Sequence, residues 1–199
     1  MKTEVILLAA GQSKRFGGIK QLADIHGQPM VCHCLSQYHQ GDKWVEGITN
    51  GHVVLGSNAT LISQVIPNNV NIYVTSSWEQ GMGHTLAESM QVISNDTTHV
   101  FVALADQVRI TQSIVMRMLQ ESNRNPEHII AAKYEGRVGA PSILPRQYFF
   151  QLSQLTGDKG AKVLLQQNPQ KTICIPIPEA AFDVDTPEDL NPSSSVYVQ

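Results

Sequence analysis

The sequence lacks the features that mark membrane, secreted and nucleic-acid-binding proteins. No apolar run among its 199 residues is long enough to cross a bilayer, so a membrane-spanning protein is not expected. The formal net charge is only -3 and charged residues make up 16%, which gives no broad basic surface for nucleic acid. The N-terminal residues 1–3 lead into an apolar run of a few residues, which is too short for a secretory signal peptide.

Cysteine is also scarce. The three cysteines, Cys32, Cys34 and Cys174, cannot all pair, and a reducing cytoplasm is the expected location. The run Cys32-His33-Cys34 suggests a metal site, but no second Cys/His pair with zinc-site spacing accompanies it. We therefore expect this segment to be helical, with cysteine serving as a small apolar residue.

The two best-known phosphate-binding patterns, Gly-x-x-x-x-Gly-Lys-Ser/Thr and Gly-x-Gly-x-x-Gly, are absent as well. What the chain has is a glycine-rich, basic loop that directly follows an apolar run over residues 5–8. Gly11 is expected to turn the backbone sharply and to let a ligand approach closely, because glycine has no Cβ. Arg15 offers a forked donor and Lys20 a compact charge, which suit a polyphosphate. The loop therefore predicts a nucleoside triphosphate site.

Apolar strand-like runs alternate with helix-like stretches along the chain. The sequence predicts strands over 4–10, 53–55, 70–74, 100–105, 129–132, 142–144 and 172–175, and helices over 29–40, 58–66, 84–93, 111–123 and 159–167. This alternation predicts an α/β fold with a mostly parallel sheet and helices on both faces. Ligands of such sheets bind at the carboxyl ends of strands, so the 11–20 loop and Asp106 are expected to face one cleft. We expect one domain over 1–190 and a polar tail over 191–199, with Tyr197 as a candidate anchor.

The full loop reads Leu-Ala-Ala-Gly-x-Ser-x-Arg-Phe-Gly-x-x-Lys-Gln-Leu over residues 8–22. It resembles the signature of the nucleotidyltransferases related to molybdenum cofactor guanylyl- and cytidylyltransferases. The Leu-Ala-Ala-Gly opening and the Lys-Gln-Leu close look most like the cytidylyltransferase branch. The resemblance implies a single-domain, Rossmann-like fold of the glycosyltransferase-A type, a Mg²⁺ cofactor, and contacts to base and sugar from Leu8, Ala9, Ala10 and Gly11.

Asp106 ends the most apolar predicted strand, in the run Leu104-Ala105-Asp106-Gln107. A carboxylate buried there without a partner costs several kcal/mol, and magnesium bound to substrate phosphates would supply that partner. The structural alternative is an aspartate that caps the loop after the strand. The family carries Leu-Ala-Asp-Gln-Pro at this point, and Val108 replaces the proline, so the rigid turn after the ligand is not implied here.

A second pair of carboxylates lies near the end of the chain, in Phe182-Asp183-Val184-Asp185-Thr186-Pro187-Glu188-Asp189. Residues 186–189 predict the start of a helix, with a cap, a proline in the first turn and then acids. The segment resembles the family's Asp-x-Asp-Thr-Pro-Glu-Asp, which lies near the nucleotide metal. The resemblance favours Asp185 as the second metal ligand, with Asp183 as the alternative.

Residues 78–86 resemble the family's Gly-Met-Gly-x-Ser-Leu type of segment. Gly81 and Gly83 are expected to let the backbone approach a flat base closely. His84 departs from the family pattern. It either faces solvent in the first helical turn or contacts the base or a phosphate.

Two further segments are assigned by resemblance to the acceptor side of the site. Residues 156–161 match the family's Thr-Gly-Asp-Lys-Gly-Ala, and Lys159 in the first turn of the next helix points to an anion, since a cation there does not stabilise the helix. Gly139 and Pro141 belong to a Gly-x-Pro element. Ala140 stands between them where a polar residue is often found, which leaves the acceptor open.

The resemblance, which spans residues 5–190, implies transfer of a nucleoside monophosphate from an NTP, with CTP favoured, to an acceptor phosphate. The implied acceptor is molybdopterin, the product is pyrophosphate, and Arg15, Lys20 and Asp106 are the expected catalytic residues. One alternative is a sugar- or alcohol-phosphate nucleotidyltransferase of the same fold. Another is a catalytically silent, nucleotide-binding maturation protein or chaperone for a molybdoenzyme client. No nucleic acid or membrane partner is expected.

Overall fold

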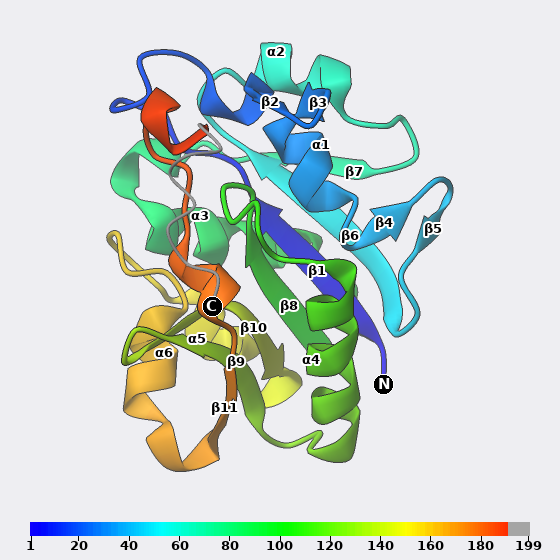
Figure 1. The fold of residues 1–199 in the computed structure, drawn as a ribbon. Helices are drawn as coiled ribbons and strands as arrows, with labels where there is room; N and C mark the ends of the chain where they lie inside the picture. The colour runs from blue at the N-terminus through cyan, green and yellow to red at the C-terminus, as the bar shows by residue number, and fades with distance from the viewer. Residues whose placement is uncertain (191–199) are drawn as a thin grey trace.

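A computed structural model describes residues 1–190, and the predicted 191–199 tail lies outside them (Figure 1). Seven strands form one sheet in the order β11-β9-β10-β8-β1-β6-β7. Of the described strands in this seven-stranded sheet, β10 alone runs antiparallel to its neighbours, β8 and β9. The strands are β1 (Thr3–Leu8), β6 (Ile48–Leu55), β7 (Asn71–Val74), β8 (His99–Leu104), β9 (Ile129–Tyr134), β10 (Arg137–Pro145) and β11 (Thr172–Pro176). The prediction of a mostly parallel α/β sheet is confirmed.

Helices cover both faces of this sheet. They are α1 (Met30–Leu35), α2 (Ala59–Ile62), α3 (Met82–Ser89), α4 (Gln112–Arg124), α5 (Phe149–Ser153) and α6 (Lys162–Gln167). Side chains from α1, α2 and α4 join one core cluster, and those from α3, α5 and α6 join the other. None of the helices in the described part of the chain is long and apolar enough to cross a membrane.

Short elements connect these layers. Two hairpins are built from β2 (Asp24–Ile25) with β3 (Gln28–Pro29), and from β4 (His39–Gln40) with β5 (Lys43–Trp44). The single-turn 3₁₀ helices are η1 (Lys20–Leu22), η2 (Ser63–Val65), η3 (Trp78–Gln80), η4 (Met90–Val92), η5 (Arg146–Tyr148), η6 (Pro169–Lys171), η7 (Pro178–Ala181) and η8 (Pro187–Leu190).

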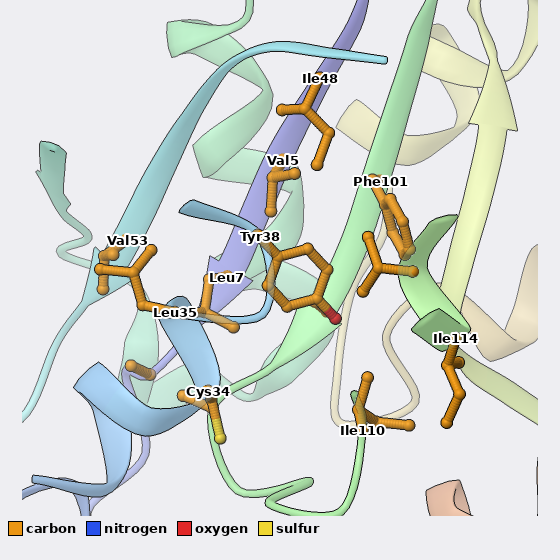
Figure 2. Packing of buried hydrophobic residues seen from close by; sticks show 14 of the residues in the cluster. Val5, Leu7, Cys34, Leu35, Tyr38, Ile48, Val53, Phe101, Ile110 and Ile114 are labelled. Atoms are coloured by element: carbon orange, nitrogen blue, oxygen red, sulfur yellow. The ribbon is translucent and has the colours of Figure 1, made fainter. Parts of the chain in front are cut away.

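Strand β1 divides the two cores because its side chains alternate between the faces. Val5 and Leu7 enter the cluster under α1 and α4, while Ile6 and Leu8 enter the opposite cluster. Figure 2 shows the first cluster, where the ring of Tyr38 meets the ring of Phe101 edge-on at 5.4 Å. Burying an aliphatic or aromatic side chain of this size stabilises the fold by about 1.5–3 kcal/mol. The sheet, packed on both faces, therefore gives the loops at its carboxyl edge a rigid support.

Three of the predicted helices differ from the structure in extent or type. The helix predicted over 29–40 ends at Leu35, because Tyr38 turns into the core and Gly41, at φ 58°, makes the tight turn between β4 and β5. The helix predicted from residue 159 begins only at Lys162, since Gly157 and Gly160 adopt positive φ and keep the preceding residues in a loop. The helix predicted to start near Thr186 is the single 3₁₀ turn η8.

Candidate active site

The loop after β1 takes its shape from a buried side chain, Gln21. Its amide Nε2 donates hydrogen bonds to the carbonyl oxygens of Ala9 (3.0 Å) and Gly11 (2.8 Å), and its Oε1 accepts one from the Ser13 hydroxyl (3.2 Å). A sharp turn was expected at Gly11, but the residues of this loop with a left-handed backbone come later, namely Ser13 at φ 59° and Gly17 at φ 72°. A Cβ placed on Gly11 would meet no atom within 4 Å, so this backbone borders open space.

Lys20 lies at the centre of a cluster of charges on that space. Its Nζ donates to Asp106 Oδ2 at 2.7 Å and to the Val184 carbonyl at 2.9 Å, and it lies 3.4 Å from Asp185 Oδ1. Arg15 approaches the other oxygen of Asp185 at 2.9 Å. The Lys20 side chain is 12% exposed, whereas that of Arg15 is 74% exposed. The loop and Asp106, predicted to face one cleft, therefore meet at the carboxyl edge of the sheet, together with Asp185.

The carboxylates of this cluster hold more negative charge than Lys20 alone neutralises. Asp106 Oδ1 is buried and has no hydrogen-bond partner. Loss of hydration, together with the nearby charges of Asp106 and Asp185, raises the pKa of Asp183 to about 6. Among residues 1–190, no group of three His, Cys, Asp or Glu side chains is arranged to hold a metal ion by itself. A cation held here would need further ligands, such as phosphate oxygens and water.

The backbone on both sides of these carboxylates is fixed by hydrogen bonds. The Val184 amide donates to the Asp106 carbonyl (3.0 Å), which joins the two acidic segments. Gln107 Nε2 donates to the carbonyls of Ala140 (3.2 Å) and Ala180 (3.0 Å). His33 Nε2 meets the Val108 carbonyl at 2.9 Å. Side-chain contacts therefore hold the turn where the family carries proline.

The Thr186–Asp189 turn is held by its own carboxylate. Asp189 Oδ2 accepts hydrogen bonds from the amides of Asp185 (2.9 Å) and Thr186 (2.7 Å). Although partial burial opposes ionisation, these amides lower the pKa of Asp189. The turn thereby fixes the backbone of Asp185 beside Lys20.

A pocket of about 450 Å³ opens over this cluster. Nine of its lining residues were expected from the sequence, namely Leu8, Ala9, Ala10, Gly11, Arg15, Lys20, Gly81, Asp106 and Asp185. Sequence reasoning missed others, including Gln21, Trp78, Thr85 and Asp158. Trp78 is the first residue of the 78–86 segment that resembles the family motif, and Gln21 lies inside the Lys-Gln-Leu close, but neither was given a role of its own. Lys14 is exposed and also borders the pocket.

The two glycines expected to approach a base both pack against the 156–158 loop, and Gly81 also lines the pocket. A Cβ on Gly81, which adopts φ 108°, would lie 2.2 Å from Asp158 Oδ1, and a Cβ on Gly83 would lie 2.5 Å from the Thr156 carbonyl. Gly83 is buried outside the pocket lining, and its amide donates to the Gly157 carbonyl. Both glycines therefore allow the start of α3 to pack on this loop.

His84 takes part in the same contact. Its Nδ1 accepts a hydrogen bond from the Gly157 amide at 3.0 Å. The residue is half-buried and does not line the pocket. His84 thus ties α3 to the loop before α6.

The residues assigned to the acceptor side lie outside the pocket lining. Gly139 and Pro141 are buried on β10, where a Cβ on Gly139 would meet the Tyr134 hydroxyl at 2.6 Å. Lys159 was expected in the first turn of a helix, but it is exposed in the loop that precedes α6. None of these three residues lines the pocket, although Ala140, between Gly139 and Pro141, contacts Gln107 next to Asp106.

Comparisons with known proteins bear on this site. Nicotine blue oxidoreductase of Paenarthrobacter nicotinovorans is 29% identical over 198 residues, which cover 93% of each chain. The bifunctional protein GlmU of Legionella pneumophila is 30% identical over 149 residues; these cover 73% of this chain and 31% of that protein. The present chain thus matches under a third of GlmU.

Two solved structures share the fold. Rv0371c of Mycobacterium tuberculosis in complex with manganese gives a TM-score of 0.71 at 21% identity, covering 94% of this chain and 95% of that one. A CMP:2-keto-3-deoxy-manno-octonic acid synthetase complexed with CTP gives 0.71 at 17% identity, covering 96% and 95%. The family model that matches the chain, over residues 5–172, includes the loop, Asp106 and most of the sheet. The chain belongs to the family of the MobA-like NTP transferase domain.

Proposed function

We propose that this protein transfers CMP from CTP to the phosphate of an acceptor, with molybdopterin as the acceptor implied by the sequence motifs, and releases pyrophosphate. The observation that supports this most is the cluster of Lys20, Asp106 and Asp185 on the pocket, at the carboxyl ends of the strands. Family membership supports nucleotidyl transfer in general.

The chemistry asks little of acid-base catalysis. An oxygen of the acceptor phosphate forms a bond to the α-phosphorus of CTP, the bond to the bridging oxygen breaks, and pyrophosphate leaves with that electron pair. The acceptor oxygen is already anionic, so positioning and charge stabilisation supply the rate. Lys20 and Arg15 would exchange their carboxylate partners for phosphate oxygens and neutralise the charge that grows on the leaving group.

Asp106 and Asp185 are the residues that would hold magnesium. The unpartnered Oδ1 of Asp106 fits this role because its buried lone pairs lack a donor. Two carboxylates with phosphate oxygens and water also match the ligand set that magnesium prefers. The ion would supply Lewis-acid stabilisation of the phosphate oxygens. The manganese in the Rv0371c complex supports a divalent cation in general.

Calorimetric titration with CTP and GTP in the presence of magnesium tests the base preference. The smaller cytosine suits the Cβ of Ala10, where a guanine-selective site is expected to carry glycine. We expect CTP to bind at least tenfold more tightly, or by about 1.4 kcal/mol. Equal or tighter binding of GTP would contradict the cytidylyl assignment and leave nucleotidyl transfer in place. Pyrophosphate release with sugar and alcohol phosphates as acceptors tests the related transfer reactions, and nucleotide binding without release would indicate a silent protein.

A second candidate rests on one observation, namely the name of the relative that matches 93% of the chain. An oxidoreductase acting on an aromatic compound would place that compound in the same pocket. Consumption of a reduced nicotinamide cofactor with an aromatic acceptor, unaffected by Lys20→Ala, would favour this candidate over nucleotidyl transfer.

A further inference from the structure

Trp78 stands out on the pocket wall because it lies beyond the residues used by the proposed chemistry. It begins η3, between β7 and α3, and its indole is half-buried. Among the described residues that line the pocket, it alone carries an aromatic ring. Ala10 and Gly11, which belong to the segment assigned to base and sugar, line the same pocket.

The side chain of Trp78 packs closely against the backbone of Gly56. A Cβ on Gly56 would lie 2.5 Å from Cβ and 2.6 Å from Cγ of Trp78, and 2.8 Å from the Ala10 carbonyl. The side chain of Trp78 therefore sits directly on the Gly56 backbone, beside Ala10. The same carbonyl accepts a hydrogen bond from the Ser57 amide at 3.0 Å, which ties the segment after β6 to the nucleotide loop.

The turn that leads into Trp78 is held by hydrogen bonds to Glu88 of α3. The carboxylate of Glu88 accepts hydrogen bonds from the amides of Ser76 (3.0 Å) and Ser77 (3.0 Å) and from the hydroxyl of Thr75 (2.6 Å). The Tyr73 hydroxyl donates to it as well, at 3.0 Å. This one carboxylate holds the whole 73–77 segment, so the ring is preorganised before any ligand binds.

We propose that the ring of Trp78 contacts the nucleobase of the bound nucleotide, and that Glu88 is the positioning residue that holds it there. This inference rests on the proposed nucleotide-binding function. Stacking on an aromatic ring tolerates every base, because each base offers a flat π-face. Trp78 therefore contributes affinity for nucleotides in general, while discrimination between bases comes from other groups on the pocket wall.

The test uses the fact that the chain has two tryptophans. Trp44 on β5 packs against Gly51 and stacks edge-on with His39, away from the pocket lining. Trp44→Phe leaves Trp78 as the fluorophore. We expect CTP and GTP with magnesium both to quench its emission, and inorganic triphosphate with magnesium to bind in calorimetry without quenching.

Substitutions then separate the ring from the phosphate site. Trp78→Ala is expected to weaken CTP and GTP binding about tenfold each, with inorganic triphosphate unchanged, and Trp78→Phe is expected to restore most of the affinity. Glu88→Gln should weaken nucleotide binding less, while leaving triphosphate binding unchanged and shifting the Trp78 emission of the free protein. The triphosphate titration also shows that the Trp78→Ala protein is folded at its site.

Two results would overturn the inference, and they differ. In the first, the unaltered protein and the Trp78→Ala variant bind CTP equally well in calorimetry, and CTP does not quench the emission of the Trp44→Phe variant. The stacking role is then wrong, and the proposed function stands. If the unaltered protein binds neither CTP nor GTP, the proposed function fails and the inference fails with it.

Discussion

At the residue scale, Lys20 and Arg15 are both cations on the pocket but differ in burial. Lys20 is held by two carboxylates and a carbonyl, whereas Arg15 has one ion pair and a largely exposed side chain. Lys20→Ala should therefore reduce turnover by about 10²-fold or more, and Arg15→Ala by less, since a directed contact in a shielded site is worth more than an exposed one. Pyrophosphate release under saturating CTP measures both.

The control for these substitutions must lie off the pocket. Lys14 is unsuitable because it borders the pocket, whereas Lys43 is exposed on the β4–β5 hairpin. Lys43→Ala should leave turnover unchanged. A similar loss from all three substitutions would mean that diffuse charge, and not directed contact, holds the phosphates.

Asp106→Asn keeps the shape of the side chain and removes its charge. If Asp106 holds the metal, turnover should fall about 10²-fold or more, which corresponds to about 3 kcal/mol of transition-state stabilisation. The fold should survive, as a thermal melt followed by circular dichroism would show. Asp42→Asn, on the exposed β4–β5 hairpin, is the matched control. Wild-type rates from Asp106→Asn would refute the metal assignment.

The residues that sequence reasoning found and missed differ in a physical way. Lys20 and Asp106 were found because charges beside glycine or at the end of an apolar run are visible along the chain. Gln21 was missed as a functional residue because its role comes from two backbone carbonyls that only the folded loop presents to it. Trp78 was missed for a similar reason, since its partner, Gly56, is distant in sequence.

At the scale of elements, the junction of α3 with the 156–158 loop has a measurable consequence. Alanine normally stabilises a helical position relative to glycine by about 0.5–1 kcal/mol. At Gly83 a Cβ would meet the Thr156 and Gly157 carbonyls at 2.5 and 2.7 Å, so Gly83→Ala should destabilise the protein, by about 1–3 kcal/mol. Urea unfolding measures the change.

Gly18→Ala is a suitable comparison for that experiment. Its Cβ would meet only a Phe16 ring carbon, at the ordinary contact distance of 3.9 Å, and Gly18 does not adopt a positive φ. We expect its unfolding free energy to change little or to rise slightly. If Gly83→Ala behaved in the same way, α3 would not be packed against the loop as closely as the structure shows.

Elements were predictable where one physical signal dominated. The buried strands β1 and β8 each contain a continuous apolar run, and α4 lies within one residue of the helix predicted over 111–123, so their positions were found from the sequence. The β4–β5 hairpin has strands of two residues, too short for a periodic pattern, and the predicted helix was extended through its first strand, β4. The late start of α6 depends on backbone conformations at Gly157 and Gly160, which composition alone does not fix.

At the scale of the whole molecule, stability should depend on pH through a buried carboxylate. Glu4 is 2% exposed on β1 and accepts hydrogen bonds from Ser94 and Thr97 beside His52. Burial opposes its ionisation, but these partners lower its pKa from 4.5 to about 2. A carboxyl whose pKa is lowered by folding stabilises the folded state at any pH above the pKa that it has in the unfolded chain. This contribution, about 3 kcal/mol, is lost as the pH falls from 4.5 towards 2.

Urea unfolding between pH 7 and pH 3 tests this expectation. Glu4→Gln should be less stable than the unaltered chain at pH 7 and should lose less stability between pH 4.5 and pH 3. Asp183 works in the opposite direction, because its raised pKa of about 6 makes the folded state lose stability as pH rises from 3.8 to 6. If the unfolding free energies of the unaltered chain and of Glu4→Gln fell in parallel as the pH is lowered, Glu4 would not be the source of the acid sensitivity.

The order of strands in the sheet also sets the order in which the molecule can assemble. Strand β1 is translated first, yet it lies between β6 and β8 near the middle of the sheet (Figure 1). Its pairing with β8 joins residues 3 and 99, so half of the chain must leave the ribosome before both sides of β1 are covered. Contacts this distant in sequence slow folding. Nascent chains that end before β8 should therefore expose the apolar side chains of β1 to chaperones and proteases, and protection should appear once β8 has emerged.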